Sequence, residues 1–327
     1  MGIIRVGFVG AGGVSKLHLE GISRHPEEVK VVAYCDPDES NIKARMQEYG
    51  ECDAYSNLGE MLANAEMDVT IVCTPTSIRE AVILPLIEAK MPTLCEKPFC
   101  DYYPEASRIT KAAAEAGVPV AVDQNFRRNF PFYIGREVLA TGELGMPLHL
   151  TQHAKGLRTD VGWRLERERY VMTVMSIHWI DGYRWMLQDE AKTVYCQGIN
   201  SPATQGREDT AISMVITFKG GTVVSLTESF SSFNRERGCT LDCEKGSLVI
   251  EQGGLKVLQP GSGPVEHKNP FDRPDGCFIL LKDLYEAAQE NREPETSVSD
   301  NIENIRILEA AYTSWKENRV VPVEEIQ

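Results

Sequence analysis

The stretch Ile4–Ser15, IRVGFVGAGGVS, decides the fold of this chain. Its first six residues have the apolar character of a buried strand, a glycine-rich turn follows at once, and a helical pattern begins at Ser15. Gly10 permits a tight turn, and Gly12 lets the backbone approach a ligand without a Cβ in the way. Because Ser15 occupies the third position of the G-x-G-x-x-G pattern, the match to that dinucleotide-binding pattern is imperfect.

An acidic residue after a second strand strengthens this interpretation of the turn. The apolar run Val29–Cys35 is followed by Asp36, at the distance where an acidic side chain binds the ribose hydroxyls of NAD. The pyrophosphate of such a cofactor lies against the backbone N–H groups of the turn and the positive end of the helix. The sequence therefore predicts cofactor contacts from Gly10, Gly12, Gly13, Val14 and Asp36. A glycine-rich turn that binds nothing is the alternative.

The bulk composition excludes several classes of function. A chain of 327 residues is too long for one compact core and long enough for two domains. Its formal net charge of −14 argues against a nucleic-acid partner, which needs a basic face. We find no signal peptide and no stretch as long and apolar as a membrane span. The nine scattered cysteines suit reduced thiols, so we expect a cytoplasmic protein without a metal site.

Two kinds of hydrophobic pattern divide the chain near residue 124. Up to residue 123, short apolar runs alternate with helical segments, which indicates a doubly wound parallel sheet. Further on, Ile212–Phe218 alternates with a period of two, and Lys219-Gly220-Gly221 predicts a hairpin turn. The sequence thus predicts an α/β fold, with a Rossmann domain at 1–123 and an α+β substrate domain with a large, mostly antiparallel sheet at 124–327. We expect the last helix, about 300–318, to pack back on the first domain.

Side chains with useful chemistry follow two strands of the predicted parallel sheet. The run that ends at Cys73 leads into Thr74-Pro75, and the run that ends at Cys95 leads into Glu96-Lys97-Pro98. Because ligands bind at the carboxyl edge of such a sheet, we expect these residues to lie against the cofactor. An amine held there can accept the proton of an alcohol as hydride leaves, or return it. A surface Glu-Lys pair after a strand is the alternative explanation.

Several motifs together resemble those of one oxidoreductase family. They are Gly10–Gly13 with His18-Leu19, Thr74-Pro75, Leu94–Pro98, Gly142–Pro147 and His178-x-x-Asp181. This set is similar to that of the family of glucose–fructose oxidoreductase, inositol dehydrogenase and the rhizopine-catabolism protein MocA. The resemblance implies an NAD-dependent oxidoreductase in which the lysine of Glu-Lys-Pro acts beside the reacting carbon. It makes Lys97 the expected catalytic residue, in contact with both cofactor and substrate.

The histidine motif departs from the family pattern. Family members usually place an acidic residue four positions before the histidine and a glycine two before it, where this chain has Val174 and Ser176. The change removes an obvious carboxylate partner of His178, and Asp181 could replace it from another direction. We expect His178 to act as a catalytic acid or base, or to bind a substrate hydroxyl, with Asp181 beside it. A purely structural histidine is the third possibility.

Further residues are expected near the cofactor and substrate. Gln124 follows the last strand of the first domain, where the family often places polar side chains beside the nicotinamide ribose. Trp163 and Arg164 lie in a predicted loop, and together they suit a sugar or polyol through apolar ring contact and directional hydrogen bonds. Arg79 stands where the family often has a histidine, and the sequence assigns it no role.

These observations predict a metal-free enzyme that transfers hydride between nicotinamide and a hydroxyl or carbonyl carbon of a sugar, inositol or related polyol. NAD is favoured over NADP because the acidic segment Asp36–Glu39 repels a 2′-phosphate. Two alternatives stay open: NAD-dependent redox-assisted glycoside cleavage, and a non-catalytic sensor of dinucleotide and sugar, which Val174 favours. The resemblance also implies a homodimer or homotetramer formed through the sheet of the second domain.

Overall fold

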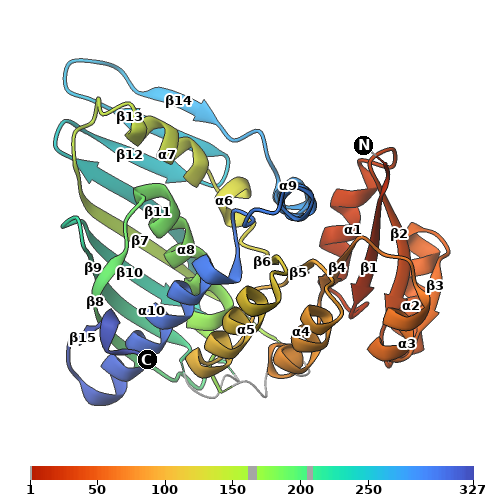
Figure 1. The fold of residues 1–327 in the computed structure, drawn as a ribbon. Helices are drawn as coiled ribbons and strands as arrows, with labels where there is room; N and C mark the ends of the chain where they lie inside the picture. Colours follow the sequence, from red (N-terminus) through yellow and green to blue (C-terminus); the bar gives the residue numbers. More distant parts are fainter. Residues whose placement is uncertain (1, 161–167, 205–208) are drawn as a thin grey trace. The chain divides into compact units, whose positions relative to one another are not determined.

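The computed structural model describes residues 2–160, 168–204 and 209–327 (Figure 1). Contacts between residues divide the chain into two compact units. The first comprises Met1–Asn125 with Asp272–Ile302, and the second comprises Phe126–Phe271 with Glu303–Gln327. Within the described ranges, no helix is both long enough and apolar enough to cross a membrane.

The first unit is built on six parallel strands in the order β3-β2-β1-β4-β5-β6. They are β1 (Ile4–Val9), β2 (Val29–Cys35), β3 (Asp53–Tyr55), β4 (Val69–Val72), β5 (Thr93–Cys95) and β6 (Val120–Val122). Its connecting helices are α1 (Ser15–Ser23), α2 (Glu39–Tyr49), α3 (Leu58–Asn64), η1 (Thr76–Ile78), α4 (Arg79–Glu88) and α5 (Tyr103–Ala116). The strand order reverses between β1 and β4, where doubly wound sheets bind their ligands. The predicted Rossmann architecture is confirmed.

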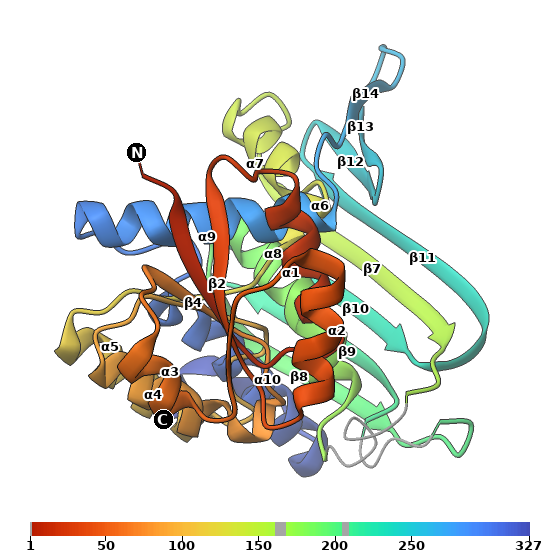
Figure 2. The same cartoon turned by 90° about the vertical axis from the view of Figure 1, so that its right-hand side faces the viewer.

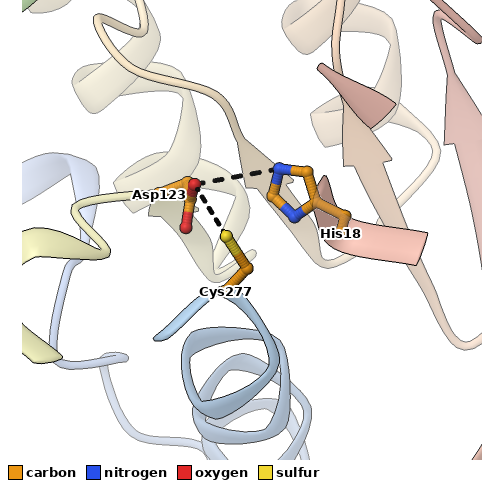
Figure 3. Close-up of side chains that lie close together, drawn as sticks. All are labelled: His18, Asp123 and Cys277. Carbon is orange, nitrogen blue, oxygen red and sulfur yellow. Dashed lines mark hydrogen bonds and ion pairs between the residues drawn. The ribbon is translucent and has the colours of Figure 1, made fainter. Parts of the chain in front are cut away.

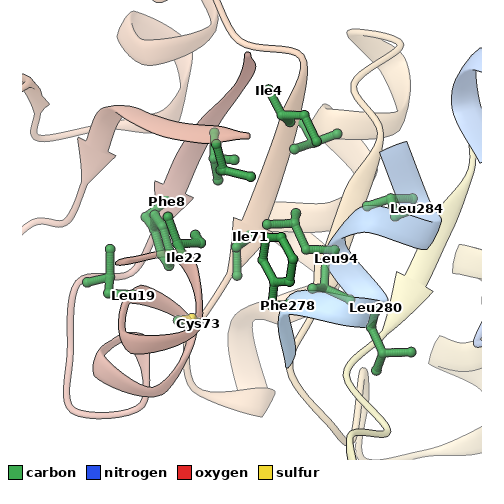
Figure 4. Close-up of a cluster of buried hydrophobic side chains, with 14 of the residues drawn as sticks. Ile4, Phe8, Leu19, Ile22, Ile71, Cys73, Leu94, Phe278, Leu280 and Leu284 are labelled. Atoms are coloured by element: carbon green, nitrogen blue, oxygen red, sulfur yellow. The ribbon is translucent and has the colours of Figure 1, made fainter. Parts of the chain in front are cut away.

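A helix from far along the chain completes this unit. Helix α9 (Arg273–Glu290) packs on α1 and adds apolar side chains to the core beneath the sheet. Figure 4 shows Phe278, Leu280 and Leu284 of α9 among Ile4, Phe8, Leu19, Ile22, Ile71 and Leu94. This division of the chain differs from the sequence expectation in the segment Asp272–Ile302, because the periodicity of a helix does not reveal which sheet it covers.

The second unit is built on a nine-stranded sheet in the order β14-β13-β12-β11-β7-β10-β9-β8-β15 (Figure 2). Its pairs are antiparallel except for β7 with β10, which is parallel. The strands are β7 (Pro147–Leu157), β8 (Ala191–Ile199), β9 (Ala211–Phe218), β10 (Val223–Ser229), β11 (Ser231–Cys243), β12 (Gly246–Glu251), β13 (Gly254–Leu258), β14 (Val265–Lys268) and β15 (Val321–Pro322). The predicted large, mostly antiparallel sheet is confirmed.

Alternating side chains explain the layering of this sheet. Ile212, Met214 and Ile216 of β9 are buried, while Ser213 and Val215 between them are exposed.

The remaining helical elements of the unit are α6 (Phe126–Asn129), α7 (Phe132–Ala140), the π-helical turn η3 (Met172–Ser176), α8 (Ile177–Leu187) and η4 (Val323–Glu325). Helix α10 (Val298–Glu317) begins in the segment assigned to the first unit and continues in the second.

The close approach of α1 and α9 generates a stability prediction. A Cβ on Gly21 would lie 2.5 Å from the backbone oxygen of Pro274, which cannot rotate away. We expect Gly21→Ala to lower the free energy of unfolding by about 1–3 kcal/mol through overpacking. A Cβ on Gly59 in α3 meets its nearest atom at 3.5 Å, so Gly59→Ala is the matched control. Equal thermal midpoints of the two variants would contradict this packing.

Candidate functional site

The first candidate site lies at the carboxyl edge of the parallel sheet, where Asp36 supports the glycine turn. Its carboxylate accepts hydrogen bonds from the backbone N–H groups of Ala11 (2.8 Å) and Asp38 (2.9 Å). The side-chain amide of Asn41 also donates to it, at 3.3 Å. Because the side chain of Asp36 is buried, these bonds fix the end of β2 against the turn that follows β1.

The glycine turn has the shape that a dinucleotide needs. Gly10 has φ +93°, and a Cβ there would lie 2.9 Å from the backbone of Cys73, so the turn can approach the end of β4 only without a side chain. A Cβ on Gly12 or Gly13 would meet no atom within 4 Å, which leaves the backbone open to a ligand. No side chain caps the helix that starts after Val14, so its positive end is available to a pyrophosphate.

The neighbouring strand ends offer polar groups to the rest of such a cofactor. Thr74 and Pro75 lie directly after β4, and the Oγ1 atom of Thr74 is buried without a hydrogen-bond partner among the described residues. Gln124 lies after β6, where its Nε2 donates to Asn301 at 3.0 Å. Its Oε1 is buried and has no partner in the described part of the chain. The residues present therefore fit NAD.

Four buried side chains form a polar cluster beneath this edge: His18, Glu96, Asp123 and Cys277. Figure 3 shows His18, Asp123 and Cys277. His18 of α1 lies 3.1 Å from the carboxylate of Glu96 and 3.8 Å from that of Asp123. The thiol of Cys277 donates to Asp123 at 3.4 Å. Burial acts to lower the pKa of His18, but the charges of Asp123 and Glu96 outweigh it and raise the pKa overall. The contact with His18 thus holds Glu96, the residue before Lys97, in place.

The same cluster has the spacing of a candidate cation site. The ligand atoms of His18, Asp123 and Cys277 lie within 4.8 Å of one another. Asp123 also accepts a hydrogen bond from Asn125 at 2.6 Å. Since these side chains bind one another, the arrangement is explained as a hydrogen-bonded cluster. The absence of a metal from this protein stays a prediction of the sequence.

Arg79 binds the backbone on both sides of Lys97. Its Nε donates to the carbonyl of Thr74 at 3.0 Å, and its Nη1 donates to the carbonyl of Glu96 at 2.7 Å and to that of Pro98. The side chain is 4% exposed. One guanidinium group thus joins the ends of β4 and β5 and fixes the peptide groups around Lys97. Sequence reasoning assigned no role to Arg79 because its partners are backbone carbonyls, which leave no signal in the side-chain pattern.

The second candidate site lies on α8 of the second unit. The ring of His178 stacks on that of Phe126, with centroids 4.0 Å apart and planes within 8°. Asp181, one turn further along, is completely buried. Its carboxylate accepts two hydrogen bonds from Arg127, at 2.8 and 2.7 Å, and one from Asn304 at 2.9 Å. These contacts hold α8 in place through Asp181. A role of Asp181 in binding substrate stays a prediction.

A buried carboxylate near His178 comes from a strand that the sequence analysis did not single out. Glu228 of β10 is 1% exposed and accepts hydrogen bonds from Ser176 Oγ at 2.6 Å and Trp179 Nε1 at 3.2 Å. These two residues flank His178 in the chain, while Val174 is buried in the preceding π-helical turn. The period-two pattern of β10 could have placed Glu228 on the buried face. Trp163 and Arg164 lie outside the described residues.

The burial of Glu228 predicts a pH-dependent stability. Burial raises its pKa from 4.5 to about 7, against the opposing effects of its hydrogen bonds and of Arg237, while the charge of Asp209 adds to the rise. The folded chain therefore keeps this proton between about pH 4.5 and 7, whereas the unfolded chain loses it. The resulting stability is fully present below pH 4.5 and is lost as the pH rises to 7, about 3 kcal/mol in all.

Glu228→Gln removes this titration, so its free energy of unfolding should rise relative to that of the wild type as the pH increases from 4.5 to 7. Urea denaturation at half-unit pH intervals measures the difference. Glu143→Gln, which changes an exposed carboxylate, is the control and should follow the wild-type profile. A constant difference between Glu228→Gln and the wild type would show that Glu228 is ionised throughout.

Comparisons with known proteins agree with these geometries. Residues 4–124 match a family described as "Oxidoreductase family, NAD-binding Rossmann fold", and residues 135–249 match the "GFO/IDH/MocA C-terminal domain". An uncharacterized oxidoreductase, YrbE, of Bacillus subtilis is 27% identical over 99% of this chain and 98% of its own length. An inositol 2-dehydrogenase of Rubrobacter xylanophilus is 24% identical over 79% of this chain and 74% of its own.

Solved structures share the fold at lower identity. An oxidoreductase from Agrobacterium radiobacter, in complex with NAD+, L-tartaric acid and magnesium, superposes with a TM-score of 0.88 at 19% identity, covering 99% of each chain. A levoglucosan dehydrogenase in complex with NADH gives a TM-score of 0.89 at 16% identity, covering 98% of this chain and 99% of the other. The two family matches together span most of the sequence. This chain therefore belongs to the Gfo/Idh/MocA family of NAD-binding oxidoreductases, as its motifs predicted.

Proposed function

We propose that this chain transfers hydride between NAD and a hydroxyl or carbonyl carbon of a sugar, inositol or related polyol. The observation that carries the proposal is the fixed backbone around Lys97. Arg79 binds the carbonyl groups before and after Lys97, and the side chain of Glu96 is held by His18. Relatives of this chain are named inositol 2-dehydrogenase, D-apiose dehydrogenase and 1,5-anhydro-D-fructose reductase. Their names support a sugar or polyol as the substrate class.

Each group in the first unit has a place in this proposal. The bound nicotinamide accepts or supplies the hydride. Backbone N–H groups of the turn hold the pyrophosphate, and Asp36 holds the ribose hydroxyls and repels a 2′-phosphate. The residues proposed to contact the cofactor are Gly10, Gly12, Gly13, Val14, Asp36, Thr74, Pro75, Glu96, Lys97 and Gln124.

The proton of the reacting hydroxyl is proposed to move to the Nζ atom of Lys97 during oxidation and to return during reduction. A lysine suits this task because its charge changes with the proton that it carries. His178 is proposed as a second acid or base, or as a ligand of a substrate hydroxyl. Trp163, Arg164 and Asp181 remain proposed substrate contacts on the sequence argument alone.

Two substitutions separate proton transfer from cofactor binding. Lys97→Met should lower kcat by about 100-fold or more, because it removes the general acid–base, while NADH binding followed by fluorescence should weaken by a much smaller factor. Asp36→Ser should weaken NADH binding by about tenfold and weaken NADPH binding less, because it removes the repulsion of the 2′-phosphate. Full turnover of Lys97→Met would overturn the assignment of Lys97. Equal losses for both cofactors would limit Asp36 to supporting the turn.

We propose that the chain works in the cytoplasm as a homodimer or homotetramer formed through the sheet of the second unit. Tyr195 of β8 and Val215 of β9 face each other in register on the exposed face of that sheet and are 37% and 40% exposed, and Ile199 is 60% exposed. Apolar side chains gathered on a sheet face favour burial against another protein. The nine cysteines are free thiols, which suits a reducing compartment.

The proposed assembly predicts that a charge placed on the exposed face of this sheet changes the mass of the protein in solution. Sedimentation equilibrium of the full chain at micromolar concentration should give at least the mass of a dimer. Val215→Asp should shift it toward the monomer, because burying an unpaired carboxylate is unfavourable. The exposed residue Lys268, on β14, provides the control Lys268→Gln. A wild-type monomer would refute the proposed assembly.

A further inference from the structure

A pocket of about 650 Å³ lies within the second unit, at the ends of β7, β10 and β11. The strand register explains its shape. Glu228 of β10 and Arg237 of β11 both pair with Ala154 of β7, one on each side. Ala154 is small, and Gly156, two residues further along the same face, has no side chain. The part of the pocket surface that β7 forms therefore has few protruding atoms. Longer side chains on β10 and β11, the two flanking strands, form the walls.

Two guanidinium groups project from the β11 wall. Arg235 and Arg237 both line the pocket, Arg237 from the regular part of β11 and Arg235 from the irregular segment that precedes Glu236. Within the described residues, neither forms an ion pair, whereas the lining residue Lys155 pairs with Glu236 at 2.9 Å. The guanidinium of Arg237 lies over the ring of Trp179, 5.3 Å from its centroid. This wall therefore presents positive charge that no carboxylate of the described chain neutralises directly.

The buried carboxyl group of Glu228, on the opposite wall, does not fully cancel this charge at neutral pH. The oxygens of Glu228 already accept hydrogen bonds from Ser176 and Trp179. Burial raises the pKa of Glu228 to about 7, so it is partly protonated where Arg235 and Arg237 carry full charge. The pocket is lined by four cationic side chains, Lys155, Arg158, Arg235 and Arg237, and by three carboxyl groups, Glu228, Glu236 and Glu251, in a chain whose formal net charge is −14.

The pocket adjoins the helical turn that carries His178. Met175 lines it, and Glu228 binds the residues two before and one after His178. Phe230 also lines the pocket, and the guanidinium of Arg158 lies over its ring, 4.9 Å from the centroid. A ligand seated here would meet the guanidinium groups of β11, with Glu228 and Phe230 in the opposite wall.

We propose that this pocket binds the anionic group of a sugar acid or sugar phosphate, with Arg235 and Arg237 as its ligands. Guanidinium groups suit this task because their planar N–H donors match the oxygens of a carboxylate or phosphate. The inference rests on the proposed function, since it names the substrate class of that reaction. It favours anionic sugars over the neutral sugars and polyols of the same ring structure.

Calorimetry on the full chain with saturating NADH tests this proposal. The probes are D-glucuronate against D-glucose, D-galacturonate against D-galactose, and glucose 6-phosphate, which separates a phosphate ligand from a carboxylate. We expect an anionic probe to bind more tightly than its neutral counterpart. Arg237→Gln should weaken that binding by about 10- to 100-fold, and the exposed Arg235→Gln should weaken it in the same direction. Lys268→Gln, which removes a charge from the same sheet outside the pocket, should leave it unchanged.

Steady-state kinetics provide the second measurement. For an anionic sugar that is turned over, Arg237→Gln should raise KM by a similar factor and change kcat little, while the KM of a neutral sugar stays constant. Equal affinity for charged and neutral probes, no binding of any anionic probe, or unchanged binding by both arginine variants would overturn the inference. Absence of turnover on every sugar would instead overturn the proposed function, and the calorimetric comparison would still decide what the pocket binds.

Discussion

The candidate chemistry of the first unit depends on one constraint, the fixed position of the peptide groups around Lys97. A flexible side chain can transfer a proton effectively only when its attachment point is held still. Arg79 supplies this by donating to carbonyls before and after Lys97, and it also binds the end of the neighbouring strand. The side chain of Arg79 is buried, so the hydrogen bonds to these carbonyl groups replace the hydrogen bonds that its guanidinium would form with water.

A second buried contact, between His18 and Glu96, holds the same segment around Lys97. The ring of His18 lies 3.1 Å from the carboxylate of Glu96, beside Asp123, and helix α9 adds Cys277 to this cluster. Because α9 returns from residues 273–290, the site depends on a helix that is distant in sequence. The second unit uses the same principle, since Arg127 and Asn304 hold Asp181 and thereby the helix that carries His178.

The departure from the family pattern at Val174 becomes intelligible in this context. The position that usually carries an acid is apolar and buried, and the residue that is usually glycine is Ser176. The hydroxyl of Ser176 binds Glu228, so a carboxyl group still lies beside this helix, although it comes from a strand. Glu228 also lines the pocket whose opposite wall carries Arg235 and Arg237. Ser176, at the changed motif, and the pocket are therefore linked through Glu228.

The sequence by itself determined the parallel sheet, the antiparallel sheet, the glycine turn with Asp36 and the family, because each is written in local periodicity and short spacing. It identified Lys97 and His178 as candidates, and their roles remain to be tested. Only the tertiary structure decided that α9 joins the first unit, that Arg79 fixes the backbone at Lys97, and that Glu228 and Arg237 flank Ala154. These facts depend on strand register and helix docking: Glu228 and Arg237 lie 74 and 83 positions from Ala154, and Cys277 lies 154 positions from Asp123. Arg79 binds backbone carbonyls only 17 and 19 positions away, but such carbonyls leave no trace in the side-chain pattern.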